Sequence, residues 1–159
     1  MSKVIILDVD QTLIDAIKKS KEKPNDKLCY IESKDYYVYL RPHVLSFIDS
    51  CFSITPYIIL WSAGTESYIE DVTNFLQQSY VFYKVITMTT YQTTTKDVDL
   101  LLTDNIVNKA LIVFVDDKIK RIKYTNDNVI VLEIPEFSYL KPDTCLIDMK
   151  NQLNILFSN

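Results

Sequence analysis

Asp8 and Asp10 stand two positions apart at the end of the first apolar run of the sequence, residues 3–9. A carboxylate at the first position can attack phosphorus and form an aspartyl-phosphate, which divides the hydrolysis of a phosphate ester into two steps. The second carboxylate lies beyond the run, where the chain can turn it back to protonate the leaving oxygen and then activate water. The spacing therefore predicts Asp8 as a nucleophile and Asp10 as a proton donor and acceptor.

Two more aspartates can complete a metal site with Asp8. Asp116 and Asp117 directly follow the apolar run 110–115. Carboxylate oxygens suit a hard octahedral cation such as Mg²⁺, whereas zinc prefers nitrogen and sulfur ligands, and the chain has a single histidine. We expect Mg²⁺ as the cofactor, bound near Asp8, Asp116 and Asp117.

Donors for a transferred phosphate follow another apolar run, residues 57–61. Ser62 can offer its hydroxyl and Ala63 its backbone N–H, because both come directly after the run. Lys96 can add a positive charge against the phosphate oxygens. We therefore expect Ser62, Ala63 and Lys96 to bind the phosphate.

These groups meet only if the apolar runs are parallel strands of one sheet, since ligands gather at the carboxyl ends of such strands. The predicted strands are 3–9, 57–61, 81–88, 110–115 and 129–134. The predicted helices are 42–52, 66–77 and 144–157, with a short helix or turn at 97–102 and a hairpin from 28–33 and 36–40. This alternation predicts an α/β sandwich of three layers with a mainly parallel sheet.

The motifs, taken together, resemble a known family. Leu7-Asp8-Val9-Asp10-Gln11-Thr12-Leu13 is similar to the DxDxT signature of the haloacid dehalogenase superfamily. The order and spacing of the later motifs resemble the small C-terminal-domain phosphatases of the FCP/SCP type. Those motifs are Tyr39-Leu40-Arg41-Pro42-His43, Leu60-Trp61-Ser62-Ala63-Gly64, Lys96-Asp97 and Val115-Asp116-Asp117.

The resemblance implies a Rossmann-like fold. The insert after Thr12 is short enough for one loop and a small hairpin, and only about 30 residues separate Ser62 from Lys96, so we expect no cap domain. The resemblance also implies that Asp8 is both nucleophile and Mg²⁺ ligand, and that Asp10 also binds the metal through its carbonyl. Asp117 would complete the metal site, and Asp116 would bind directly or through water. Thr12, Ser62 and Lys96 would lie at the phosphate. The chain departs from the family pattern at Gln11, Ser62 and Asp117, and it has no arginine in residues 87–91.

Length and composition limit the remaining possibilities. A chain of 159 residues that is 48% hydrophobic predicts a single domain over residues 1–159. The net charge of −4 disfavours general nucleic-acid binding, and one glycine excludes glycine-rich nucleotide loops. Three scattered cysteines and no long apolar stretch predict an intracellular protein, cytoplasmic or nuclear, that does not bind membranes. The sequence does not indicate an oligomeric state.

Three functions fit these observations. The first is a phosphatase for phosphoserine or phosphothreonine in a protein, for example a tail like that of RNA polymerase II. The second is a polynucleotide 3′-phosphatase, which uses the same DxDxT chemistry on a nucleic-acid substrate. The third is a phosphopeptide- or protein-binding module that keeps the fold without turnover. The presence of both Asp8 and Asp10 favours an enzyme over the third.

Overall fold

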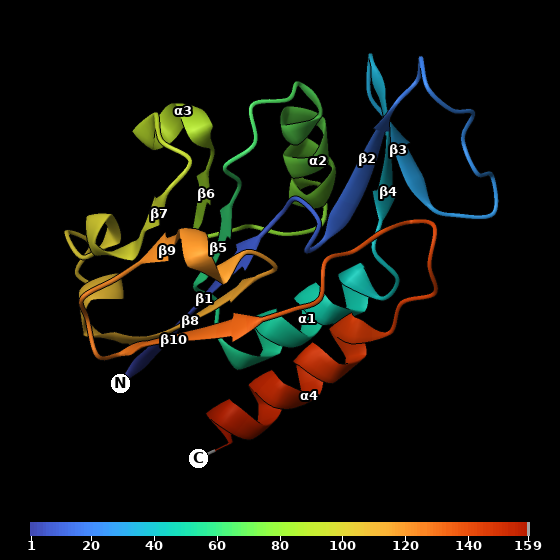
Figure 1. Cartoon of the computed structure of the whole chain (residues 1–159). Helices are drawn as coiled ribbons and strands as arrows, with labels where there is room; N and C mark the ends of the chain where they lie inside the picture. Colours follow the sequence, from blue (N-terminus) through green and yellow to red (C-terminus); the bar gives the residue numbers. More distant parts are fainter. Residues whose placement is uncertain (159) are drawn as a thin grey trace.

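A computed structural model describes residues 1–158 as an α/β fold built on a five-stranded parallel sheet (Figure 1). The strands lie in the order β10-β8-β1-β5-β6. Their bounds are β1 Ser2–Asp8, β5 Ile58–Trp61, β6 Lys84–Ile86, β8 Ala110–Asp116 and β10 Val129–Glu133. All four pairings in this sheet are parallel. The predicted fold class, α/β with a mainly parallel sheet, is confirmed.

Apolar side chains cover both faces of this sheet, because residues along a strand alternate between the two faces. Ile5 and Leu7 of β1 belong to one buried cluster, which also contains residues of three helices. Val4 and Ile6 belong to a second cluster on the other face. The helices of the first cluster are α1 (Val44–Ile54), α2 (Tyr68–Gln77) and α4 (Cys145–Phe157). Two short 3₁₀ helices pack in the second, η1 (Val98–Leu101) and η2 (Val107–Lys109).

The insert after the first motif is larger than the predicted hairpin. The expected strands appear as β3 (Tyr30–Glu32) and β4 (Tyr36–Leu40), but β4 also pairs with β2 (Ile14–Lys18). The resulting three-stranded sheet stands beside the main sheet in Figure 1. Periodicity did not reveal β2, because its five residues include Asp15 and Lys18 and alternate only weakly in burial.

Several further short elements were not predicted. The strand expected at 81–88 is limited to β6, and a short helix, α3 (Met88–Tyr91), follows it. Two dipeptides form a small parallel pair, β7 (Lys96–Asp97) and β9 (Ile122–Lys123). A 3₁₀ turn, η3 (Ile119–Arg121), precedes β9. Such short elements carry too few residues for a pattern, and β7 and β9 exist because they pair with each other.

One buried arginine ties the first motif to the C-terminal part of the chain. The guanidinium of Arg41 is fully buried and donates to both carboxylate oxygens of Asp143, at 2.9 and 2.8 Å. It also donates to the carbonyl oxygens of Thr12 at 3.0 Å and Pro135 at 2.7 Å. Arg41 therefore fixes the loop that follows Asp8 and Asp10.

Replacing this arginine tests how strongly the fold depends on the contact. Arg41→Ala leaves Asp143 buried without its partner, and loss of one member of a buried ion pair costs about 3–5 kcal/mol. We expect a decrease of that size in the free energy of unfolding, measured by urea denaturation. Lys19→Ala is the control, because the Lys19–Glu32 pair is more exposed and such a pair contributes about 1 kcal/mol or less. Equal losses in the two variants would contradict this account.

Candidate active site

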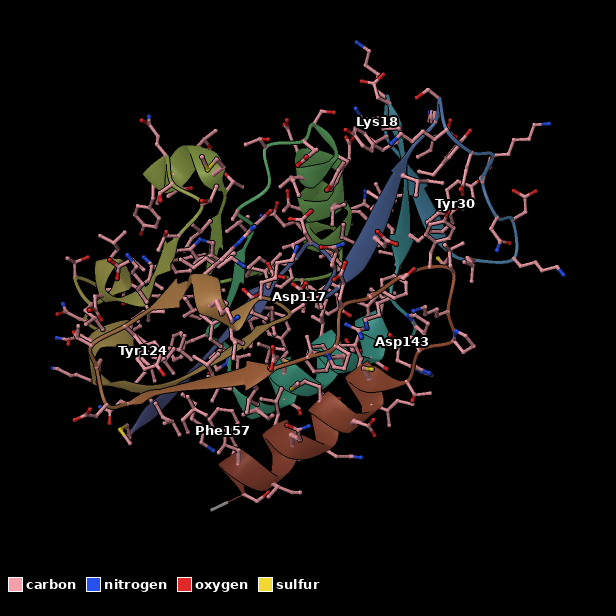
Figure 2. All side chains as sticks on the ribbon, in the orientation of Figure 1. Lys18, Tyr30, Asp117, Tyr124, Asp143 and Phe157 are labelled. Atoms are coloured by element: carbon pink, nitrogen blue, oxygen red, sulfur yellow. The ribbon has the colours of Figure 1, made fainter. Side chains whose placement is uncertain are left out.

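Carboxylates and one lysine meet at the carboxyl edge of the main sheet. Asp8 ends β1 and Asp116 ends β8, and these two strands are neighbours in the sheet. Asp117 follows β8, and Figure 2 shows it near the middle of the molecule, between the main sheet and the sheet that carries Tyr30. The side chains line a cavity of about 420 Å³. The parallel topology thus places three predicted site residues together, as the positions after strands indicated.

Lys96 lies between two of these carboxylates. Its ammonium group donates to Oδ1 of Asp8 and, at 2.6 Å, to Oδ2 of Asp116. All three side chains are almost completely buried. Lys96 reaches this place because β7 pairs with β9, which follows closely after Asp116 in the chain.

Burial and crowding shift the acid–base properties of this group. Burial raises the pKa of Asp8 to about 8, with a further contribution from Asp116, although the charge of Lys96 acts in the opposite direction. Burial also raises the pKa of Asp117. For Lys96, burial alone would lower the pKa, but the charges of Asp8 and Asp116 outweigh it and raise the pKa. Lys96 is therefore a stable cation, whereas burial and the charge of Asp116 favour the protonated form of Asp8 when no other cation is bound.

The donor set fits a divalent cation. Asp8, Asp116 and Asp117 each offer a carboxylate oxygen, and these oxygens lie within 4.8 Å of one another. Three carboxylates and one ammonium leave two negative charges uncompensated when all are ionised. Moreover, Oδ2 of Asp117 is the only buried side-chain oxygen or nitrogen of residues 1–158 without a hydrogen-bond partner. An oxygen-only set with one free buried oxygen is what a hard cation such as Mg²⁺ requires.

Asp8 is held from two sides. Thr12 donates its hydroxyl to Oδ2 at 2.6 Å, while Lys96 contacts Oδ1. Thr12 is fully buried and its hydroxyl also lies 3.4 Å from Asp117. Thr12 therefore orients the carboxylate of Asp8 without itself lining the cavity. The direct contact of Thr12 with phosphate stays a prediction.

Asp10 is held by two hydroxyl groups. Ser62, directly after β5, donates to Oδ2 at 2.7 Å, and Tyr68, at the start of α2, donates to Oδ1 at 2.7 Å. Burial and the charge of Asp10 raise the pKa of Tyr68, so its hydroxyl keeps its proton. Ser62 is buried, like Thr12, and its predicted contact with phosphate is likewise untested. Ala63 lines the cavity, as expected of a phosphate donor.

The only glycine of the chain lies against Asp10. A Cβ atom at Gly64 would stand 3.0 Å from Oδ2 of Asp10 and 3.2 Å from Oε2 of Glu66. Its backbone N–H also donates to the hydroxyl of Ser62 at 3.2 Å. A side chain here would crowd the carboxylate of Asp10, so the small residue leaves room for this carboxylate and is not required by a positive φ.

Sequence reasoning assigned no role to several residues of this site. Tyr68 belongs to the apolar face of the helix predicted at residues 66–77. Helical periodicity does not reveal that its hydroxyl group contacts Asp10. Asp15 lies on the unpredicted strand β2, and Lys118 and Arg121 lie around the unpredicted turn η3; all three line the cavity. The position of Lys118, directly after Asp117, was the one signal available for this group.

No helix in residues 1–158 has both the length and the apolar character that crossing a membrane requires.

Two solved structures share the fold. A variant of the fission yeast RNA polymerase II CTD phosphatase Fcp1 bound to beryllium fluoride matches with a TM-score of 0.64 and 14% identity over 99% of this chain and 51% of that chain. A second structure, of Fcp1 described as an essential RNA polymerase II CTD phosphatase, matches with a TM-score of 0.65 and 15% identity over 99% and 48%. This chain therefore spans about half the length of both.

A search of curated protein sequences gave no match. The family comparison is more informative, because residues 3–158 match the profile described as NLI interacting factor-like phosphatase. That range contains the sheet, the insert and every residue of the site. The chain belongs to the NLI interacting factor-like phosphatase family, within the haloacid dehalogenase superfamily.

Proposed function

We propose that this protein is a Mg²⁺-dependent phosphatase that removes phosphate from phosphoserine or phosphothreonine in proteins through an aspartyl-phosphate on Asp8. The observation that carries the proposal is the pair of carboxylates at one cavity, each fixed by two hydrogen-bond donors. Thr12 and Lys96 hold Asp8, and Ser62 and Tyr68 hold Asp10. Preorganised groups of this kind suit a reaction in which little rearrangement accompanies bond formation.

In the first step, an oxygen of Asp8 attacks phosphorus and the bond from phosphorus to the serine or threonine oxygen breaks. Asp10 gives a proton to the departing oxygen, so a neutral hydroxyl leaves. In the second step, Asp10 takes a proton from a water molecule, whose oxygen attacks phosphorus. The bond to Asp8 then breaks, and inorganic phosphate leaves with Asp8 restored as a carboxylate and Asp10 restored as the protonated acid.

The hydrogen bonds of Asp10 suit both of its roles. Ser62 can donate to a carboxylate or rotate its hydroxyl to accept from a protonated carboxyl group. Tyr68 keeps its proton and therefore holds the same oxygen of Asp10 in both states. Ala63 and Lys96 line the cavity, and we expect them to hold the phosphate oxygens.

Asp8, Asp116 and Asp117 would hold the Mg²⁺ ion, with Asp10 contributing its carbonyl oxygen. When bound, the ion would offset the negative charge of the carboxylates and the phosphate, so that an anionic nucleophile can approach an anionic substrate. The raised pKa of Asp8 without a cation supports this assignment, because Asp8 must be ionised to attack.

The form of the site supports a phosphate displayed on a larger molecule. Between Ser62 and Lys96 the described chain forms α2, β6 and α3 rather than a separate lid domain. The cavity of about 420 Å³ lies between the main sheet and the insert. The two solved neighbours are named as phosphatases of the RNA polymerase II C-terminal domain. The organisation of residues 1–159 as one domain stays a prediction.

Two substitutions test the assigned roles of the carboxylates. Asp8→Asn removes the nucleophile and should lower kcat by about a thousandfold or more. Asp10→Asn removes the proton carrier and should lower kcat by about a hundredfold to ten-thousandfold. Phosphate release is measured from p-nitrophenyl phosphate, phosphoserine peptides and a 3′-phosphorylated oligonucleotide, with folding checked by circular dichroism.

Asp26→Asn is the matched control, because Asp26 is an exposed aspartate in the loop between β2 and β3. Near-normal activity of Asp8→Asn would contradict the nucleophile assignment. Preference for the oligonucleotide would favour a polynucleotide 3′-phosphatase. Absence of turnover on every substrate by the folded, Mg²⁺-loaded protein would favour a binding module.

Binding of Mg²⁺ is tested separately by thermal unfolding. A ligand that binds only the folded state stabilises it by about 2.7 kcal/mol at a concentration one hundred times its Kd. We expect Mg²⁺ to raise the Tm of the wild-type protein and to have a much smaller effect on Asp117→Asn, which loses a ligand. Asp148→Asn, on the exposed side of α4, should respond like the wild type. An equal rise in Tm for Asp117→Asn would contradict the proposed site.

A further inference from the structure

A row of positive charges lies directly after the metal-binding aspartates. Four of the six residues at positions 118–123 are basic, and the row contains no acidic residue. The cations are Lys118, Lys120, Arg121 and Lys123. This local excess stands out in a chain whose net charge is −4. The row forms η3 and β9, the orange turn and strand above the carboxyl end of β8 in Figure 1.

Two members of this row line the cavity, Lys118 and Arg121, and they differ in whether their side chains have a partner. The guanidinium of Arg121 makes no hydrogen bond or ion pair with any other of the residues 1–158, whereas Lys118 donates to Oε1 of Gln11 at 2.8 Å. The chain has two arginines, and the other, Arg41, is buried in structural contacts. Arg121 is thus the one arginine whose planar group is free to bind a ligand.

The backbone holds Arg121 beside the reacting groups. The next residue, Ile122, pairs with Lys96 in the β9–β7 ladder, and Lys96 contacts Asp8. Thr94, two residues before Lys96, lines the same cavity wall as Arg121. A ligand group held by Arg121 would therefore lie next to the phosphate attacked by Asp8, and not at a remote surface.

The opposite side of the cavity is acidic. Asp15 on β2 and Glu66 before α2 line it, and Glu136 lies near Asp15 and adds to its raised pKa, which is due first to burial. One edge of the cavity therefore attracts anions, while the edge across from it repels them.

We propose that Arg121 binds a second anionic group of the substrate, beside the phosphate that is removed, and that the substrate is an acidic or multiply phosphorylated protein segment. The inference rests on the proposed protein-phosphatase function and specifies its substrate class. An arginine side chain binds a phosphate or carboxylate through two parallel N–H donors, which makes it suited to this role.

The same basic row would attract a polynucleotide, but the acidic edge disfavours one. A nucleic acid carries a phosphate at every residue, so its backbone would have to pass Asp15 and Glu66 as well as Arg121. A peptide can place one additional anion at Arg121 and neutral or basic residues on the other side. The distribution of charge around the cavity therefore favours a peptide.

The test compares kcat/KM for matched peptides in the Mg²⁺-loaded protein. The reference peptide carries a single phosphoserine. Two further peptides add a second phosphoserine, either two residues before or two residues after the first. Two more carry glutamate at these positions in place of the second phosphoserine. We expect the wild type to prefer one of the bisphosphorylated peptides by at least about fivefold. Arg121→Gln should reduce this ratio to near one, mainly by raising KM, and Arg121→Lys should keep part of it.

Lys120→Gln is the control, because it removes a positive charge from the neighbouring exposed position, which does not line the cavity. It should keep the wild-type ratio. A higher kcat/KM with glutamate as well as with phosphoserine would show that the subsite accepts carboxylates. A higher kcat/KM with phosphoserine alone would show that the subsite requires phosphate. Either result supports the proposal.

Peptide turnover without a preference, or equal losses in Arg121→Gln and Lys120→Gln, would overturn the proposed subsite and leave the phosphatase function intact. Failure of the wild type to release more phosphate from peptides than Asp8→Asn does would overturn both proposals. A higher kcat/KM for a 3′-phosphorylated oligonucleotide would overturn the peptide assignment in favour of a nucleic acid.

Discussion

The buried ammonium group of Lys96 is the contact on which the arrangement of the site depends. It bridges Asp8 and Asp116, which end two neighbouring strands, and without it three carboxylates would face one another in a nearly dry environment. Burial raises the pKa of Asp8 even with Lys96 present, and repulsion from Asp116 adds to that rise. The short β7–β9 pair is therefore important for the site, because it positions Lys96 between these carboxylates.

A second set of contacts gives the carboxylates of Asp8 and Asp10 different surroundings. Asp8 is buried among charged groups, while Asp10 is partly buried and lies between the hydroxyl groups of Ser62 and Tyr68. Arg41 holds the loop that follows Asp8 and Asp10 through the carbonyl oxygen of Thr12. One carboxylate is thereby suited to bind metal and phosphorus, and the other to carry a proton between water and the leaving oxygen.

The main sheet was predictable because its strands are buried on both faces and form unbroken apolar runs, such as 110–115. The aspartates at the ends of these runs were placed together by the parallel topology alone. The role of Tyr68 and the existence of β2, β7 and β9 were not predictable. They depend on contacts between distant residues, such as the hydroxyl of Tyr68 with Asp10 and the backbone of Lys96 with Ile122, which leave no period in the sequence.

The most direct test of the central claim is chemical trapping of the phosphorylated residue. The protein is mixed with substrate and Mg²⁺, quenched in acid and treated with borohydride, which reduces an aspartyl-phosphate to homoserine, and the peptides are sequenced by mass spectrometry. Homoserine at position 8 that requires substrate and is missing in Asp8→Asn is the expected result. Homoserine at the position of another aspartate would contradict Asp8 as the nucleophile. The absence of homoserine from an Asp10→Asn variant that still binds and slowly turns over substrate would contradict it as well.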